Sequence, residues 1–288
     1  MKSRRFLRAL ATGAGVALVA LVAWLLLREE GAPQQGLPKG FDSGQFTAGR
    51  PRLDAPYVAT DTEVVDAMLG LAQVKPGERV VDLGSGDGRI LIAAARSHGA
   101  GGLGVDIDPE RVRESIANAR AAGVSGRVEF RRQDLFETPL DRADVITLYL
   151  SNEVNLQLRN RLLEQARPGT RIVSHDFDMG EWRPDGRQRV GTSNVYLWIV
   201  PARVEGRWLF TVGERSIPIT LDQQFQTFFG TATVGDRQVR IEQGTLAASA
   251  IRFIADLGAG RRAYEGRVDG DTIVPTSARA PWRMTRAN

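Results

Sequence analysis

Three acidic residues and a glycine-rich loop are spaced along the first half of the chain in a pattern that suits a nucleotide-like ligand. Asp82 precedes the G-x-G-x-G loop of residues 84–88, and further acids stand at Asp106 and Asp134. Glycine allows positive φ and close approach of the backbone to a ligand. A helix that starts after such a loop points its free N–H groups into it. Asp106 follows the loop by about twenty residues, the spacing at which an acid meets ribose hydroxyls in nucleotide-binding βαβ units.

The elements that must position these residues are short strands alternating with helices. Apolar runs of strand length are bounded by turn residues, and amphipathic runs at helical spacing lie between them. We predict strands at residues 80–83, 102–106, 127–131, 144–150 and 170–175, an antiparallel hairpin at 189–200, and helices at 61–72, from Asp108 onward and at 156–165. Ligands of open α/β sheets bind outside the carboxyl ends of the strands. The glycine loop and the acids are therefore expected at one edge of the sheet.

The spacing of the glycines separates two cofactor classes. The dinucleotide fingerprint requires G-x-G-x-x-G, but Arg89 stands where its third glycine should be. The segment from Asp82 to Arg89 instead resembles motif I of class I S-adenosylmethionine (SAM) methyltransferases, whose ligand carries a sulfonium but no pyrophosphate. An NAD-dependent oxidoreductase is disfavoured, because no acid/base motif for hydride transfer accompanies the loop.

Residues 56–182 as a whole resemble these enzymes, nearest to the group of mitochondrial adenine-nucleotide-translocase lysine methyltransferases and their bacterial relatives. The segments that carry the resemblance are 56–60, 82–89, 104–106, 134–136 and 148–150. The resemblance implies a Rossmann-like seven-stranded methyltransferase sheet in an α/β domain, SAM as methyl donor and, by likeness alone, a protein lysine as acceptor. The Asn/Asp-Pro-Pro-Tyr motif of methyltransferases that act on nucleobases or glutamine is absent.

The same resemblance implies a set of cofactor-binding residues. The glycines would lie at the methionine part of SAM, Asp106 at the ribose and Asp134 at the adenine. Tyr57 and Thr60 would help to close the site, although they can equally belong to a helix that only covers the sheet. The full set is Tyr57, Thr60, Asp82, Gly84, Ser85, Gly86, Gly88, Asp106, Ile107, Asp134 and Leu135.

Candidates for catalysis follow the fourth and fifth predicted strands. The sulfonium already makes the methyl group electrophilic, so the protein mainly aligns the attacking nucleophile. An ammonium nucleophile must first lose a proton. Tyr149, Glu153 and Asp176 are placed at strand ends for such work, as is His175. Each can also be an ordinary loop, capping or buried residue, and no acid/base residue is assigned.

Composition excludes several other functions. The 288-residue chain contains no cysteine and two histidines, so it has no disulfide, no thiolate chemistry and no zinc cluster of these residues. The net charge of +4 comes from four basic residues among the first eight, and the rest of the chain balances 34 basic against 34 acidic residues. No nucleic acid partner is expected from that balance. The oligomeric state stays open.

The N-terminal segment predicts a membrane association. Residues 9–27 carry no charge over 19 positions and follow a basic start, which is near the minimum for a membrane span. We interpret residues 1–30 as a single-pass anchor; a cleaved or exported signal peptide is the alternative. The positive-inside rule then places the body outside the cytoplasm. This conflicts with the cytosolic origin of SAM, so the side of the membrane is left open.

The rest of the chain divides into a linker and two domains. Residues 31–50 are rich in Gly, Pro and Gln and read as a linker. We predict a SAM-dependent methyltransferase domain at 51–203 and a β-rich accessory domain at 204–288, a small sandwich or half-barrel for substrate recruitment or stability. The outward topology and this β domain also allow a second function, a non-catalytic envelope binding protein that kept the fold.

Overall fold

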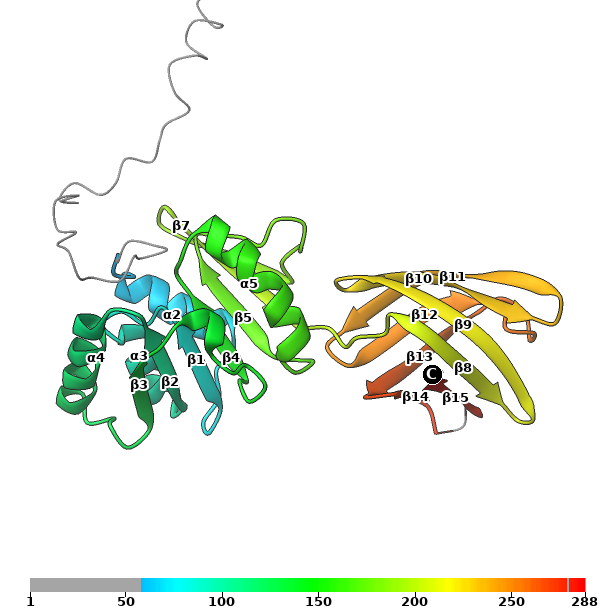
Figure 1. The fold of residues 1–288 in the computed structure, drawn as a ribbon, viewed down its shortest axis with the longest axis horizontal. Coiled ribbons are helices and arrows are strands. Elements are labelled where there is room, and N and C mark those ends of the chain that lie inside the picture. The colour runs from blue at the N-terminus through cyan, green and yellow to red at the C-terminus, as the bar shows by residue number, and fades with distance from the viewer. Residues whose placement is uncertain (1–57, 279, 288) are drawn as a thin grey trace, which may run out of the picture. The chain divides into compact units, whose positions relative to one another are not determined.

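The computed structural model describes residues 58–278 and 280–287 (Figure 1). In chain order these residues form a mixed sheet covered by helices and then an antiparallel β-barrel. The predicted anchor at 9–27, the linker at 31–50 and Tyr57 lie outside the described residues. Within the described part, no helix is both long and apolar enough to cross a membrane.

The first sheet has seven strands in the order β3-β2-β1-β4-β5-β7-β6. The first five of these pair in parallel, whereas β7 runs antiparallel to both β5 and β6. This confirms the predicted Rossmann-like seven-stranded sheet and the closing hairpin. The strands are β1 (Arg79–Leu83), β2 (Gly101–Asp106), β3 (Val128–Arg132), β4 (Val145–Leu148), β5 (Arg171–His175), β6 (Gly186–Val190) and β7 (Ser193–Ile199).

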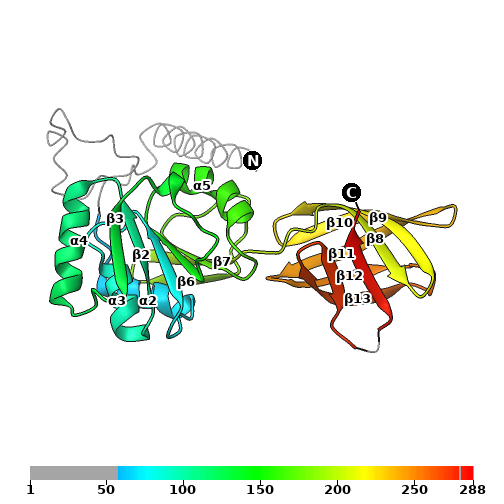
Figure 2. The ribbon, with the colours of Figure 1, turned by 60° about the horizontal axis from the view of Figure 1, so that its bottom comes forward.

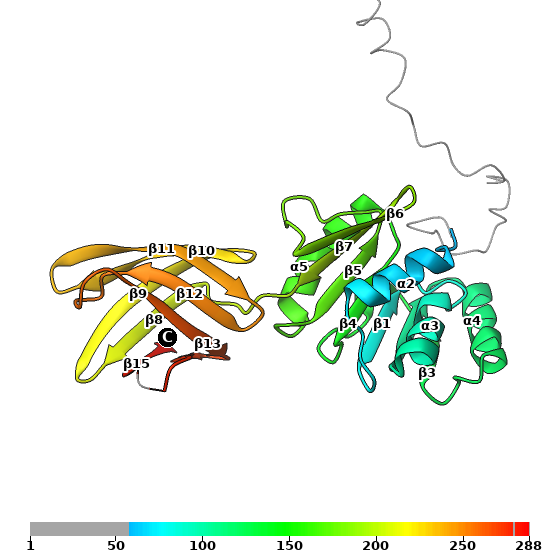
Figure 3. The ribbon, with the colours of Figure 1, turned by 180° about the vertical axis from the view of Figure 1, so that it is seen from behind.

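Helices cover both faces of this sheet. Side chains alternate along each strand, so Val80 packs under one set of helices and Val81 under the other. Figure 3 shows α2, α3 and α4 over one face, and Figure 1 shows α5 over the opposite face. The helices are α2 (Thr62–Leu71), α3 (Arg89–His98), α4 (Pro109–Ala121) and α5 (Asn152–Gln165), with the short 3-10 helix η2 (Leu135–Glu137).

The helix after β4 begins earlier than the sequence predicts. We expected a helix from residue 156, but α5 starts at Asn152 because the Ser151 hydroxyl accepts a hydrogen bond from the Val154 amide at 3.3 Å. Serine at this position satisfies one of the free N–H groups of the first turn. The polar stretch that read as a strand-end loop is therefore the first turn of a helix, and β4 ends at Leu148.

The C-terminal β region is a closed barrel, so the predicted sandwich or half-barrel is wrong in form, although the all-β content is confirmed. Eight strands follow the order β10-β11-β12-β13-β14-β15-β8-β9, and Figure 2 shows β11, β12 and β13 side by side. Closure comes from pairing of β15 with β8, a contact between distant segments that no local pattern reveals. The strands are β8 (Gly206–Val212), β9 (Arg215–Gln224), β10 (Thr227–Val234), β11 (Arg237–Ala247), β12 (Ala250–Ala255), β13 (Arg262–Asp269), β14 (Thr272–Pro275) and β15 (Trp282–Arg286).

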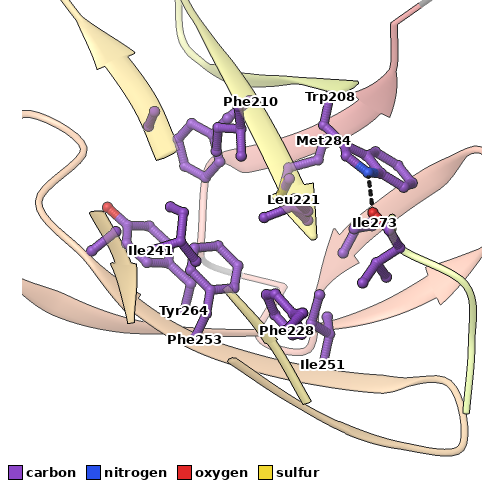
Figure 4. Packing of buried hydrophobic residues seen from close by; sticks show 14 of the residues in the cluster. Trp208, Phe210, Leu221, Phe228, Ile241, Ile251, Phe253, Tyr264, Ile273 and Met284 are labelled. Carbon is purple, nitrogen blue, oxygen red and sulfur yellow. Dashed lines mark hydrogen bonds between the residues drawn. The ribbon is translucent and has the colours of Figure 1, made fainter. Parts of the chain in front are cut away.

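Large side chains fill the inside of this barrel (Figure 4). The Phe253 and Tyr264 rings stack with centroids 5.1 Å apart, and Phe210 stacks on Trp282 at 5.5 Å. The buried Trp208 indole satisfies its N–H by donating to the Val204 carbonyl at 2.7 Å. An eight-stranded barrel has an interior just wide enough for side chains to fill, and this one is a packed core.

Candidate active site

A cavity opens at the carboxyl end of β1, where the sequence predicts a ligand site. The space that it outlines, about 920 Å³, includes open solvent in front of it. Many of the predicted residues line it: Thr60, Gly84, Ser85, Gly86, Asp106, Ile107, Asp134, Leu135 and Tyr149. Asp82, Gly88, Glu153 and Asp176 are not among its lining residues.

The glycine loop is shaped by its backbone and by an acid. Gly84 and Gly86 have φ of 79° and 52°, a region that other residues rarely enter. A Cβ on Gly84 would lie 2.7 Å from the Leu150 side chain. The Gly86 amide donates to the Asp106 carboxylate at 2.9 Å, which ties the loop to the end of β2. The loop is therefore held in place before any ligand binds.

Asp106 keeps room for a ligand in spite of these bonds. Its second oxygen accepts from the Asp108 amide at 2.9 Å, and an ionised carboxylate offers about four lone-pair sites. Burial raises the pKa of Asp106 above its usual value, and the two backbone hydrogen bonds oppose that shift. Its remaining acceptor capacity fits a pair of hydroxyl donors, such as those of a ribose.

Gly88 has a packing reason rather than a place in the cavity wall. It is the N-terminal cap of α3 with φ of 82°. A Cβ built on it would lie 2.6 Å from the ring of Phe130 and 2.9 Å from the side chain of Ser115. The lack of a side chain on Gly88 lets α3 lie close to α4 and β3, and its contact with the methionine part of SAM stays a prediction.

Asp82 is a buried acid behind the loop. One of its oxygens accepts a hydrogen bond from the Thr147 hydroxyl at 2.6 Å, and the other has no partner among the described residues. Burial raises the pKa of Asp82 to about 7; the Thr147 bond lowers it, and the charges of Asp106 and Asp87 raise it further. A cationic ligand nearby would favour the ionised form, because charges interact strongly in a low-dielectric interior.

One polar atom of the cavity wall lacks a partner. The Ser85 hydroxyl is buried and makes no hydrogen bond within the described part of the chain. An unsatisfied buried polar group costs about 1–3 kcal/mol, so a ligand with a polar group at this point would remove that cost. Together with the carboxylates of Asp106 and Asp134 and the apolar side chains of Ile107 and Leu135, these features fit a nucleoside that carries a cation. They do not fit a pyrophosphate.

Asp134 stands at the far end of the cavity from Tyr149 along the strand order. Its carboxylate accepts from the Phe136 amide at 2.8 Å and thereby caps η2. Gln133, which precedes it, also lines the cavity and extends the predicted set. The turn of η2 presents Leu135 to the same space, so polar and apolar groups suited to a purine ring adjoin each other.

The three catalytic candidates lie in different surroundings. Tyr149 follows β4 and lines the cavity, while the ring of His175 stacks on it with centroids 3.9 Å apart. Glu153 is exposed on the first turn of α5, where hydrogen bonds to its own backbone amide and to Ser151 lower its pKa. Asp176 has φ of 60° and accepts from the Asn194 amide at 2.7 Å. The structure thus brings Tyr149 to the cavity and leaves the two acids outside its wall.

Two partners of these residues escaped the sequence analysis. Thr147 lies on β4 and bonds Asp82 from the neighbouring strand; a hydroxyl in the apolar run of residues 145–150 was the available signal. Ser193 starts β7, and its hydroxyl lies 3.0 Å from His175 Nε2. No local pattern could reveal that contact, because it depends on β7 pairing with β5.

Comparison with known proteins agrees with this site. Residues 82–186 match the ANTKMT methyltransferase domain. A protein-lysine N-methyltransferase of Saccharolobus islandicus is 40% identical over 150 residues, which is 50% of this chain and 93% of that protein. The adenine nucleotide translocase lysine N-methyltransferase of Mus musculus is 30% identical over 66% of this chain and 76% of its own length.

A solved structure shares both sequence and fold. It is described as an RNA methyltransferase from Salinibacter ruber in complex with S-adenosyl-L-homocysteine. It is 52% identical, with a TM-score of 0.50 over 51% of this chain and 96% of that chain.

The sheet, the glycine loop and the acids define a class I SAM-dependent methyltransferase, and the solved complex with the demethylated cofactor agrees. The chain belongs to the ANTKMT-type methyltransferase family. It is therefore an enzyme that uses SAM as its methyl donor, as the sequence predicts. None of the three matched proteins spans the whole chain.

Proposed function

We propose that this protein transfers the methyl group of SAM to the side-chain amine of a lysine in a protein substrate. Two relatives with this chemistry in their names, one archaeal and one mammalian, support the proposal. The observation that carries it is the environment of Tyr149. Its ring and the His175 ring form an uncharged aromatic pair. The negative charges of Asp61 and Asp176 influence the pKa values of both residues.

The charges near this pair favour a basic acceptor. The negative charges of Asp176 and Asp61 raise the pKa of Tyr149, in addition to the effect of burial. A lysine ammonium is attracted to such a place, and partial burial then favours loss of its proton. The phosphates of an RNA would be repelled there. The proposed cofactor residues are the predicted ones that line the cavity, with Asp82 behind them: Thr60, Gly84, Ser85, Gly86, Asp106, Ile107, Asp134 and Leu135.

RNA is the second candidate acceptor, because the solved structure with 52% identity is described as an RNA methyltransferase. A non-catalytic binding protein has no support among the matched proteins. One experiment separates the two acceptors. The full-length protein is incubated with methyl-labelled SAM and a cell extract, and the extract is then treated with either ribonuclease or protease.

Label that survives ribonuclease, is released by protease and maps to methyl-lysine by mass spectrometry is the expected result. Label lost with ribonuclease would contradict the lysine proposal and favour RNA. A matched control carries Asp106→Ala, which should remove incorporation by weakening SAM binding. Incorporation that is insensitive to this variant would come from a contaminating enzyme.

We further propose the location and division of the chain. Residues 1–30 anchor the protein to a membrane through residues 9–27, residues 31–50 are a linker, residues 51–203 transfer the methyl group and residues 204–288 assist them. The uncharged run after a basic start supports the anchor. Fractionation of the full chain and of a chain lacking residues 1–30 tests this proposal. Protease protection of the tagged C-terminus identifies the side of the membrane.

A further inference from the structure

The order of the strands divides the carboxyl edge of the sheet into two halves. With the order β3-β2-β1-β4-β5, the glycine loop after β1 stands in the middle. On one side of it, Asp106 ends β2 and Asp134 follows β3. On the other side, Tyr149 follows β4 and His175 ends β5. The groups suited to a nucleoside lie on the first side. The second side is left for the nucleophile.

We propose that Tyr149 contacts the methyl-acceptor amine and that His175 is a positioning residue, which fixes the ring of Tyr149 for this contact. The inference rests on the proposed function and deepens it, because it assigns the acceptor site. It gives Glu153 and Asp176, which lie outside the cavity wall, no contact with the reacting amine.

His175 is held from three directions. Its Nε2 lies 3.0 Å from the Ser193 hydroxyl, its Nδ1 lies 3.4 Å from the Thr60 hydroxyl, and the face of its ring stacks on Tyr149. The side chain is 5% exposed. Ser193 in turn donates to the Asp176 carboxylate at 3.5 Å. A ring fixed on both nitrogens gives the Tyr149 ring a rigid surface to lie against.

Tyr149 lies between the cavity and a group of aromatic side chains. It is partly buried, it lines the cavity beside Leu150, and its ring also stacks on Phe177 with centroids 6.2 Å apart. Leu150 meets Gly84 of the loop, so the chain just after β4 adjoins the loop where the methyl donor is expected. A nucleophile that lies against Tyr149 is therefore next to that loop.

The aromatic pair carries no charge of its own at neutral pH. Burial lowers the pKa of His175, while the charges of Asp176 and Asp61 oppose this shift. The Tyr149 phenol stays protonated, because burial and the same two carboxylates raise its pKa. An amine that reaches this surface exchanges water for aromatic faces, which favours its neutral, nucleophilic form. The two carboxylates attract it beforehand as a cation.

The reaction at this place needs no base from the protein. The lysine ammonium releases one proton to solvent as it leaves water and becomes a neutral amine. Its lone pair then forms the nitrogen–carbon bond while the sulfur–carbon bond of SAM breaks, and the electrons of that bond remain on sulfur. S-adenosylhomocysteine and a methylated ammonium result. The contribution of Tyr149 is alignment, which is worth a large factor in rate because an error of about 1 Å can cost roughly 100-fold.

A double-mutant cycle tests whether His175 acts through Tyr149. The rate of methyl transfer is measured for the full chain at saturating labelled SAM, with the total protein extract as acceptor. Tyr149→Ala and His175→Ala should each lower the rate by roughly 10- to 100-fold. The double variant should be no slower than Tyr149→Ala alone, since a residue that acts only through another adds nothing after its removal. Multiplied losses would overturn the positioning role.

Controls separate this effect from general destabilisation. SAM binding, measured by calorimetry, should change by less than about threefold in each variant, since the site for the nucleoside lies across the loop. Tyr196→Ala and His98→Ala remove the same ring types from places outside the cavity wall and should transfer at the unaltered rate. His175→Phe keeps a ring under Tyr149 and should restore part of the rate. A rate as low as that of His175→Ala would overturn the stacking account.

A binding measurement tests the acceptor site without any protein substrate. The chain has four tyrosines, so carbon-13 labelling of their rings gives few NMR signals. n-Butylamine, a model of the lysine side chain, is titrated into the full chain saturated with S-adenosylhomocysteine. The signal assigned to Tyr149 through Tyr149→Phe should shift most, and should stay unshifted in His175→Ala. A Tyr149 signal that never moves would overturn the proposal, even where the extract assay shows lysine methylation.

Discussion

The methyltransferase sheet and the C-terminal barrel treat buried groups in opposite ways. Behind the glycine loop lie a carboxylate oxygen of Asp82 and the hydroxyl of Ser85, both buried without a partner, and two further orphaned polar atoms belong to Asn155 and Arg159 of α5. In the described part of the barrel there is no such atom. The indole N–H of Trp208, a buried donor of the barrel core, donates to the Val204 carbonyl.

The pKa values follow the same division. Every resolved shift among the described residues falls between Asp82 and His175, within the sheet region. Perturbed groups in a cavity are typical of functional sites, and orphaned polar atoms raise the cost of folding. Among these groups, Asp106 and Tyr149 line the cavity, whereas Glu129 and Arg131 form an exposed ion pair. The barrel is organised around a packed core of aromatic and aliphatic side chains.

The largest effect should come from opening the barrel core. Phe253 is 1% exposed and stacks on Tyr264, so Phe253→Ala should lower the free energy of unfolding by about 3–5 kcal/mol. Chemical denaturation measures this loss, and calorimetry under native conditions should give a SAM affinity unchanged within about twofold. Phe229→Ala is the matched control, because Phe229 is 62% exposed. A clear loss of SAM affinity in folded Phe253→Ala would show that the barrel supports the site.

The next effect concerns Asp82 and depends on pH. Burial raises the pKa of Asp82 from 3.8 to about 7, so the folded protein binds a proton that the unfolded chain has released between these values. The stability that this proton contributes is complete below about pH 4 and is lost as the pH rises through about 7. Asp82→Asn cannot lose this stability. Its free energy of unfolding, relative to that of the unaltered protein, should therefore increase by about 2–4 kcal/mol between pH 4 and a pH above 7.

Thermal unfolding from pH 4 to pH 8 without ligand tests this sign. Asp222→Asn is the matched control, because the Asp222 carboxylate on β9 is exposed and stays hydrated when the chain folds. A stability difference for Asp82→Asn that stays flat over this range would contradict the burial account. SAM should also bind the unaltered protein more tightly as the pH passes 7, since a cation favours the ionised carboxylate. Asp82→Asn should lose that trend.

A third effect tests the ribose assignment. Asp106→Ala removes a half-buried carboxylate that accepts hydrogen bonds from the Gly86 and Asp108 amides and has further acceptor sites. The loss of charge-assisted hydrogen bonds should weaken SAM by about 1.5–3 kcal/mol, which calorimetry reads as a rise in dissociation constant. Asp144→Ala is the control, since Asp144 accepts from the Arg79 amide at the other end of the sheet. An unchanged SAM affinity in Asp106→Ala would contradict the assignment.

The parts that could be predicted from sequence are those with a local cause. The parallel core of the sheet follows from apolar runs bounded by turns, and the N-cap role of Asp108 follows from its place before Pro109. The glycine loop announces itself through residues that need positive φ, as Gly84 and Gly86 do. The cavity at the carboxyl edge follows from these elements and from the general rule for α/β sheets.

The parts that could not be predicted depend on contacts between distant segments. The barrel closes through the register of Met284 with Phe210, and either strand alone would read the same in an open sheet. The acceptor side depends on Ser193 and Thr60 meeting His175. Gly88 belongs to the same G-x-G-x-G pattern as Gly84. It packs against the Phe130 side chain instead of lining the cavity, and the sequence pattern does not reveal this difference.

The smallest effect is expected at Glu153, which tests whether the functional region of the sheet domain includes the first turn of α5. Its carboxylate is exposed and satisfied within the first turn of α5, by its own amide and by Ser151. Glu153→Gln should therefore change kcat and the SAM affinity by less than about twofold, as is usual for surface substitutions. Steady-state assays measure kcat for Glu153→Gln and, for comparison, for Tyr149→Ala. A tenfold or greater loss of kcat in Glu153→Gln would show that the Glu153 carboxylate takes part in the reaction. The functional region would then extend from the carboxyl edge of the sheet onto the first turn of α5.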